Sequence, residues 1–449
     1  MVFKIYNTLA NKKEEFKSSK KKINAFCCGI TSYNHAHIGH AKSYTQFDLI
    51  IKYLKYKKFN IFYLQNITDL DDKIIKSAKE EKTDWKTLAR RYEKSYLEDM
   101  KILGNDSVDK YARATDYIPQ IVSQVKRLIK KGYVYEINDG FYYNVKKFKD
   151  YGKLSGRTIV QAEDGVSRID ENKEKKNKAD FCVWKFSKPG EPIWQVEDFK
   201  GRPGWHIEDT AITEKELGEQ YDLHAGAVDL IFPHHEAEIS LMESISGKKP
   251  FVKHWTHMAF LNMKKEKMSK SKGNFITIKK ALEKWDPKTL RCFFLSNHYR
   301  TPLEYSEETI NHAKNSLERL QDFVSHLQKS KEKDNLKLIE KTKKDFFTAM
   351  DNDLDTPKAF AILFNFVREV NKSGGSKKSL ELIKEIDSIF NILDFSKKSL
   401  DQEIKKLIDE REKARKDKDF NKADKIRDNL KKKGIILEDT NQGVKWKKG

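Results

Sequence analysis

The chain has 449 residues, with 89 lysines and arginines against 68 aspartates and glutamates, which gives a formal net charge of +21. This length allows roughly two to four domains. The positive charge favours a polyanionic partner, although a general lysine bias would give the same balance because the lysines are spread along the chain. The four cysteines are too few and scattered for a disulfide framework, and no apolar run approaches the ~18 residues of a membrane span. We therefore expect a cytoplasmic protein without a membrane partner.

The first part of the chain alternates between strand and helix patterns. Residues 23–28 are predicted as a strand, 29–33 as a break, and 41–56 as an amphipathic helix. A second strand, 59–64, precedes the segment 66–69 and another helix. Such a βαβ unit implies a parallel sheet with its site at the carboxyl ends of the strands. We therefore predict the α/β fold class.

The turn between the first strand and its helix contains His37-Ile38-Gly39-His40. Helix N-termini have unpaired N–H groups and a positive dipole end, so they form ready anion sites. Gly39 has no Cβ, which lets a nucleotide base approach the backbone. Imidazole N–H groups can donate to a phosphoryl group whose charge grows in the transition state. We predict that His37, Gly39 and His40 bind ATP, with both histidines catalytic.

A second motif, Lys267-Met268-Ser269-Lys270-Ser271, follows about 230 residues later. Two flexible ammonium groups on a loop can neutralise pyrophosphate and move away afterwards. Each motif alone also fits an ordinary surface turn, but the two together, in this order, resemble the signature of class I aminoacyl-tRNA synthetases and related nucleotidyltransferases. The resemblance implies that all five residues bind ATP with its Mg²⁺, and that the two lysines are catalytic.

The remaining patterns suggest a division into successive parts. We predict two halves of a class I synthetase-like Rossmann catalytic domain at 1–117 and 204–251, interrupted by an α+β insertion at 118–203. Residues 252–308 are predicted to form a region with the lysine loop and contacts to an RNA stem, and 309–400 a helical bundle. Residues 401–449 are predicted as two helices and a small hairpin, a basic module suited to anticodon binding. A purely structural hairpin is the alternative.

A second constellation consists of Cys28, His234 and Glu238. Pro233 suits the first turn of a helix, and this places His234 and Glu238 at i and i+4, on one face and within reach of one ion. Cys28 ends the first strand, whereas Cys27 points to the opposite face because side chains alternate along a strand. Taken singly, each of these residues is more often structural than a ligand.

Here the sequence resembles the cysteinyl-tRNA synthetase family, effectively from Tyr6 to Trp446, with the most specific blocks at 26–31, 66–69, 204–208 and 232–236. In that family a zinc ion held by two cysteines, a histidine and a glutamate binds the substrate's thiolate. The resemblance implies Cys28, His234 and Glu238 as three ligands.

The chain departs from the family at the fourth ligand, where Asp209 replaces a cysteine, and in the run 224–229. Aspartate can ligate zinc at about 2.0–2.2 Å, so the site can survive with harder ligands. Weak binding, or none, is equally open. We expect a Zn²⁺ site formed by Cys28, Asp209, His234 and Glu238.

The function implied by the resemblance is ATP-dependent activation of L-cysteine and its transfer to the 3′ end of cysteine tRNA, by a monomer. Cys28, Thr68, Trp205 and Asp229 match the amino-acid site. One alternative is a cysteine ligase that uses an amino-sugar acceptor, whose relatives lack a developed RNA module. Another is a catalytically silent RNA-binding relative, which the two intact motifs argue against.

Overall fold

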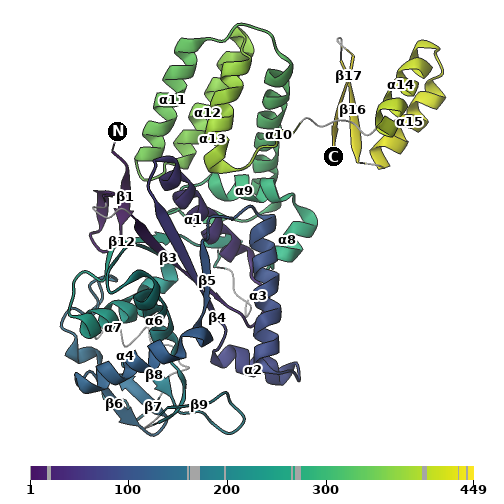
Figure 1. Ribbon diagram of the computed structural model, residues 1–449. Helices are drawn as coiled ribbons and strands as arrows, with labels where there is room; N and C mark the ends of the chain where they lie inside the picture. The colour runs from purple at the N-terminus through teal and green to yellow at the C-terminus, as the bar shows by residue number, and fades with distance from the viewer. Residues whose placement is uncertain are drawn as a thin grey trace. The chain divides into compact units, whose positions relative to one another are not determined.

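The computed structural model describes residues 2–17, 22–158, 161, 172–196, 199–263, 266–267, 275–396, 402–432, 434–440 and 443–448. These residues divide into two compact units, Met1–Leu393 and Asp394–Gly449 (Figure 1). Each unit has a hydrophobic core of its own, and we describe them separately. Among the described helices, none contains an apolar stretch long enough to cross a bilayer.

A parallel sheet forms the centre of the first unit, in the order β12-β11-β3-β4-β5. Its strands are β3 (Ile23–Thr31), β4 (Ile61–Thr68), β5 (Lys110–Arg113), β11 (Tyr221–Ala227) and β12 (Val252–Met258). Along the chain, β4 and β5 are added on one side of β3, and β11 and β12 are added later on its other side. The strand order therefore reverses between β3 and β11. In open α/β sheets, ligands bind at such a reversal, beyond the carboxyl ends of the strands. The predicted α/β class and parallel sheet are confirmed.

Helices link and cover these strands: α1 (Ile38–Tyr56) connects β3 to β4, and α2 (Asp72–Glu80) and α3 (Trp85–Ile102) connect β4 to β5. β3 is longer than its predicted end at residue 28, because it resumes pairing with β4 after a shift in register, with Thr31 opposite Thr68. The strands approach so closely there that a Cβ on Gly29 would lie 1.7 Å from the Asn66 carbonyl oxygen. The helix also begins three residues earlier than predicted.

An antiparallel sheet is inserted between the two halves of the parallel one, in the order β6-β7-β8-β10-β9. The strands are β6 (Val134–Ile137), β7 (Gly140–Tyr143), β8 (Phe181–Lys185), β9 (Trp194–Gln195) and β10 (Lys200–Pro203), and they follow α4 (Ile118–Lys130). β7 ends at Tyr143, and Val145 lies in the short 3-10 turn that follows it. Trp184 of the insertion shares one hydrophobic core with Phe26 and Trp255 of the parallel sheet, so the insertion packs against that sheet.

Helices α10 (Glu307–Lys329), α11 (Leu336–Asp351), α12 (Thr356–Ser373) and α13 (Lys377–Phe390) form a bundle, preceded by α8 (Ile278–Lys284) and α9 (Pro287–Leu295) (Figure 1). Buried Asp353 connects distant segments, because its carboxylate accepts from the Tyr6 backbone N–H, the Tyr299 hydroxyl and the Arg300 side chain. Two small sheets, β1-β2 (Lys4–Asn7, Lys12–Glu15) and β14-β13-β15 (Glu266–Lys267, Leu261–Met263, Leu303–Glu304), complete this unit.

The second unit contains α14 (Gln402–Lys416), α15 (Phe420–Lys432) and an antiparallel hairpin of β16 (Ile435–Thr440) and β17 (Gly443–Lys448). Its small core comprises Ile408, Ile426, Leu430, Ile435 and Leu437. The two helices and the hairpin predicted for this part of the chain are therefore present.

Candidate active site and metal centre

Four side chains expected to bind metal meet at the reversal of the sheet. Cys28 lies in the last part of β3, Asp209 on α6 (Trp205–Leu217), and Glu238 on α7 (Glu236–Ser246). His234 comes from the helical turn Ile231–His235 immediately before α7. One ligand atom from each lies within 4.8 Å of all the others, and all four residues are buried. The expected quartet is thus a compact cluster.

The contacts within this quartet centre on the His234 ring. Its Nε2 atom lies 3.0 Å from Asp209 Oδ2 and 3.2 Å from Glu238 Oε1. Asn66 Nδ2 donates to Asp209 Oδ1 at 2.5 Å, which fixes the orientation of that carboxylate. Cys27 Sγ, by contrast, lies 3.6 Å from the Cys28 carbonyl oxygen, and Cys27 belongs to neither group of candidate ligands among the described residues.

The sequence predicts that Pro233 lies in the first turn of a helix, and it does. Phe232 has the extended angles φ −137° and ψ 132°, and the helical turn that starts at Pro233 runs into α7, which is assigned from Glu236. His234 and Glu238 still share a face, because the turn before α7 continues into the helix without a further break.

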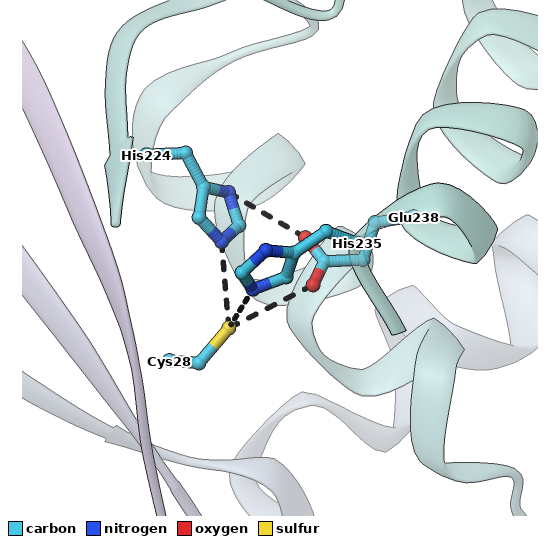
Figure 2. Close-up of side chains that lie close together, drawn as sticks. All are labelled: Cys28, His224, His235 and Glu238. Atoms are coloured by element: carbon cyan, nitrogen blue, oxygen red, sulfur yellow. Dashed lines mark hydrogen bonds and ion pairs between the residues drawn. The ribbon is translucent and has the colours of Figure 1, made fainter. Parts of the chain in front are cut away.

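A second group of donors shares Cys28 and Glu238 with the first. The Cys28 thiol faces two further imidazoles, with Sγ 3.4 Å from His224 Nε2 and 3.1 Å from His235 Nε2 (Figure 2). Sγ is also 3.7 Å from Glu238 Oε1. The sequence analysis did not assign His224 or His235. His224 comes beside Cys28 only because β11 pairs with β3, residue 224 opposite Phe26, and local spacing gives no signal of that pairing.

Outer hydrogen bonds hold both of these additional rings. His224 Nδ1 lies 2.6 Å from the Tyr221 hydroxyl, and His235 Nδ1 lies 2.8 Å from His257 Nε2. Occupation of Nδ1 in this way fixes a ring's orientation and leaves Nε2 free to face an ion. Burial lowers the pKa of both rings well below the usual value, so each is a neutral donor.

His234 has an equivalent arrangement. Its Nδ1 is 2.8 Å from His206 Nδ1, and its ring stacks on Trp205 with centroids 4.2 Å apart. Trp205 is 40% exposed, whereas the Trp255 ring that stacks on His224 is fully buried. The tryptophan that stacks on His234 is therefore partly exposed to solvent, whereas the one that stacks on His224 is not.

The buried acidic groups of this cluster would be stabilised in their charged forms by a bound cation. Burial, reinforced by Glu238 and Asp209, raises the pKa of the Cys28 thiol well above its usual value. Burial and Asp209 likewise raise the pKa of Glu238, whose Oε2 has no hydrogen-bond partner within the described part of the chain. This oxygen lies 3.6 Å from His224 Nδ1. A buried carboxylate oxygen without a hydrogen bond, beside sulfur and imidazole nitrogen, fits a divalent zinc ion, which would stabilise the deprotonated ligands.

The histidine motif lies at the N-terminus of α1, as expected. His37 is the N-cap, and its Nδ1 accepts from the His40 backbone N–H at 3.3 Å while His40 Nδ1 accepts from the His37 N–H at 3.3 Å. The rings stack with centroids 3.7 Å apart. A Cβ on Gly39 would lie 2.9 Å from the His37 ring, so glycine makes room for the histidine itself. Burial and His37 lower the pKa of His40 well below normal.

The segment that follows the lysine motif is attached to this helix start. His37 forms a β-bridge with Thr277, and the Ile38 N–H donates to the Ile276 carbonyl oxygen at 3.0 Å. Lys267 ends strand β14. The side chain of Lys267 and the residues Met268, Ser269, Lys270 and Ser271 lie outside what the structure describes.

Comparison with known proteins supplies the family. Residues 15–315 match the family described as "tRNA synthetases class I (C) catalytic domain". A cysteine–tRNA ligase of Thermococcus onnurineus (strain NA1) is 42% identical over 475 residues, which span 100% of this chain and 99% of that protein. The chain belongs to the cysteinyl-tRNA ligase family. The resemblance found in the sequence is confirmed.

Further matches concern the C-terminal part of the chain and the fold. Residues 345–394 match the DALR domain, and 397–446 the cysteinyl-tRNA ligase anticodon binding domain. The fold is similar to Mycobacterium tuberculosis methionyl-tRNA synthetase in complex with methionyl-adenylate (TM-score 0.61, 15% identity, 83% of this chain and 89% of that chain). It is also similar to the Agrobacterium radiobacter K84 agnB2 LeuRS in a ternary complex (TM-score 0.62, 9% identity, 84% of each chain). The class I synthetase fold is thereby confirmed.

The residues expected at the amino-acid site of this cysteinyl-tRNA ligase family member occupy different environments. Cys28 belongs to both groups of donors described above, and Trp205 stacks on His234. Thr68 is buried at the end of β4, where Asn66 Nδ2 approaches its hydroxyl at 3.4 Å, and the same amide reaches Asp209. Asp229 is exposed in the short turn Val228–Leu230 after β11.

Proposed function

We propose that this chain activates L-cysteine with ATP and transfers it to the 3′ end of cysteine tRNA. The observation that carries the proposal is full-length similarity to a cysteine–tRNA ligase. It is supported by the buried cluster of sulfur, imidazole and carboxylate donors and by a helix start capped by His37. In the first step the cysteine carboxylate attacks the α-phosphorus of ATP and expels pyrophosphate. In the second, the terminal ribose hydroxyl of the tRNA attacks the acyl carbon and releases AMP.

The two histidines of the nucleotide motif stabilise the charge that develops on the phosphoryl oxygens. Their Nδ1 atoms are occupied by the mutual cap, so Nε2 is the atom of each ring that can face ATP. Lys267 and Lys270 neutralise the departing pyrophosphate, together with the Mg²⁺ that accompanies ATP. The bridge between His37 and Thr277 supports this assignment, since it connects the lysine segment to the histidines.

Cysteine is recognised by the buried quartet Cys28, Asp209, His234 and Glu238, which would hold zinc. When bound, zinc supplies a soft partner for the substrate's sulfur and keeps that sulfur deprotonated, which serine cannot match. Hydrogen bonds alone separate such isosteric side chains poorly. Trp205 stacks on His234, and Thr68 and Asp229 contribute to positioning the amino acid.

Cysteine-dependent exchange between ATP and pyrophosphate tests the first step, and charging of cysteine tRNA tests the second. We expect both activities, with serine at least 100-fold poorer. Exchange without charging would favour the alternative ligase that uses an amino-sugar acceptor, and neither activity would favour the silent RNA-binding relative. The match of residues 397–446 to an anticodon binding domain argues against the amino-sugar ligase.

A further inference from the structure

The turn between α11 and α12 lies at the end of the helical bundle nearest β1 (Figure 1). Asp353 in this turn is fully buried, and both it and Leu354 have left-handed backbone angles, with φ 66° and 52°. Residues other than glycine keep such angles only where their surroundings enforce them, and they often cluster near functional sites. We propose that Asp353 is a positioning residue for adenylate formation, because it holds the backbone segment that supports the lysine motif.

Asp353 binds three consecutive residues of the segment that follows α9. Its carboxylate accepts from the Tyr299 hydroxyl and pairs with the Arg300 guanidinium at 2.7 Å. Its carbonyl oxygen lies 2.9 Å from His298 Nε2. The carboxylate also accepts from the Tyr6 backbone N–H at 2.8 Å. A single aspartate of the bundle thus fixes this segment against the first strand of the chain.

The segment fixed by the aspartate supports the strand that precedes the lysine motif. The Ala259 N–H donates to the Tyr299 carbonyl oxygen at 2.8 Å, and the Leu303 N–H donates to the Phe260 carbonyl oxygen at 3.0 Å. β15 then pairs with β13, and β13 pairs with β14, which ends at Lys267. The first residue of the lysine motif therefore belongs to a short sheet that is connected to the bundle through this aspartate.

The same strand is also attached to the helix that carries the histidine motif. Lys42 lies two residues after His40 on α1, and its Nζ atom donates to the Ala259 carbonyl oxygen at 2.6 Å. Ala259 is therefore held at its N–H by the segment that Asp353 fixes, and at its carbonyl by α1. A shift of this strand would move the lysine motif relative to the two histidines, and a misplacement of about 1 Å can cost roughly 100-fold in rate.

The chemistry of this link favours a role in orientation. An ion pair with a buried carboxylate contributes little net stability, because the charges lose their hydration, but its hydrogen bonds are directional and fix the groups that they join. Asp334 provides a contrast within the same bundle. Its carboxylate accepts hydrogen bonds from the backbone and side chains of Ser376 and Ser379. These bonds join parts of the bundle to one another and do not involve the strand before the lysine motif.

Cysteine-dependent exchange between ATP and pyrophosphate, measured on the full-length protein, tests this role, which rests on the proposed function. Asp353→Asn keeps the size of the side chain and suits a left-handed backbone, but it removes the charge. We expect kcat to fall by about tenfold, with the KM for cysteine within about twofold of wild type. Asp334→Asn is the matched control, which should lower thermal stability while kcat stays within about twofold of wild type.

Two further measurements separate positioning from a general loss of stability. Relative to the amides of β4, the amide of Ala259 should exchange hydrogen about tenfold faster in Asp353→Asn and at an unchanged rate in Asp334→Asn. If Asp353 and Arg300 act as a unit, adding Arg300→Met to Asp353→Asn should lower kcat by no more than about a further twofold. Independent, additive losses would contradict the role of the pair.

The outcomes distinguish this inference from the proposed function. Wild-type protein without cysteine-dependent exchange would overturn the proposed function, and the positioning role with it. An active wild type with an unchanged kcat in Asp353→Asn, or with an equal loss in Asp334→Asn, would overturn the positioning role alone. If Asp353→Asn does not fold, Tyr299→Phe removes only one hydrogen bond to the aspartate. Its kcat should fall about threefold, and an unchanged value would overturn the proposal.

Discussion

Asp209 stands at the position where the family resemblance implies a cysteine ligand. Its carboxylate is held by Asn66 and lies 3.0 Å from His234 Nε2. Asp209→Cys would substitute a soft thiolate for a hard oxygen donor at equal charge. We expect zinc affinity to rise by about 10- to 100-fold, as measured by competition with a chromophoric chelator. Asp209→Asn, which removes the charge, should not strengthen binding. Wild-type protein that stays fully active after exhaustive chelation would show that this chain discriminates cysteine without zinc.

The substitution Lys270→Ala tests the role proposed for the lysine motif in ATP chemistry. The Lys270 ammonium is expected to act on charge that develops only in the transition state, so Lys270→Ala should lower kcat for cysteine activation by about 100-fold, roughly 2.7 kcal/mol, with little change in the KM for cysteine. Lys280→Ala, which removes an exposed lysine of the same region on α8, is the matched control. Pyrophosphate exchange gives both constants, and an unchanged kcat in the Lys270 variant would refute its assignment.

The buried side chain of Lys42 should make the stability of the protein depend on pH, and this effect does not involve the candidate metal ligands. Burial lowers the pKa of Lys42 to about 7, and its ammonium contacts are the Gln46 side chain and the Ala259 carbonyl oxygen. The unfolded chain takes up this proton near pH 10.4. Between pH values of about 7 and 10.4 the Lys42 amine is protonated in the unfolded chain but neutral in the folded one. Lowering the pH in this range therefore favours the unfolded chain, and the free energy of unfolding falls by about 1.4 kcal/mol per pH unit.

Urea unfolding of wild type and Lys42→Gln at several pH values between 7.5 and 9.5, values chosen to lie within that window, isolates this contribution. The stability of wild type relative to the variant should decrease steadily as the pH is lowered across that range. Parallel stability curves for the two proteins would mean that Lys42 keeps an ordinary pKa.

At the scale of elements, the start of α1 combines a structural role with a chemical one. The His37 side chain caps the helix, which in general contributes about 1 kcal/mol. Asparagine can also cap, so His37→Asn should preserve stability to within about 0.5 kcal/mol while adenylate formation falls by about 100-fold. His37→Ala should lose both. Thermal unfolding and pyrophosphate exchange measure the two effects, and an active Asn variant would reduce His37 to a cap.

The elements also show what the sequence could predict. Apolar periodicity located β3, α1 and β4, because burial against the sheet imposes it. Their ends were less accurate, since Ile30 and Thr31 pair with β4 through a shifted register and histidine is not a usual N-cap. The quartet was foreseeable from motif resemblance and i, i+4 spacing. His224 was not, because its proximity to Cys28 arises from the pairing of strands that lie almost two hundred residues apart.

For the whole molecule, the division after Leu393 predicts separable activities. A fragment of residues 1–399 should retain cysteine-dependent pyrophosphate exchange but charge tRNA poorly, because it lacks the unit that matches an anticodon binding domain. Binding of full-length protein to tRNA should weaken steeply with salt, and replacing one lysine that binds an RNA phosphate should reduce the logarithmic slope by roughly 0.7–0.9. Undiminished charging by the fragment would contradict RNA recognition by this unit.

The strand order has a consequence for synthesis on the ribosome. β3, β4 and β5 emerge first, but β11, the partner for the other edge of β3, follows about a hundred residues later. At translation rates of roughly 5–20 residues per second, that edge waits about 5–20 s for its partner. It is a row of unpaired backbone groups on an apolar strand, the kind of edge that recruits other chains. Nascent chains of this protein should therefore be most prone to aggregation, and most dependent on chaperones, while the insertion is being made.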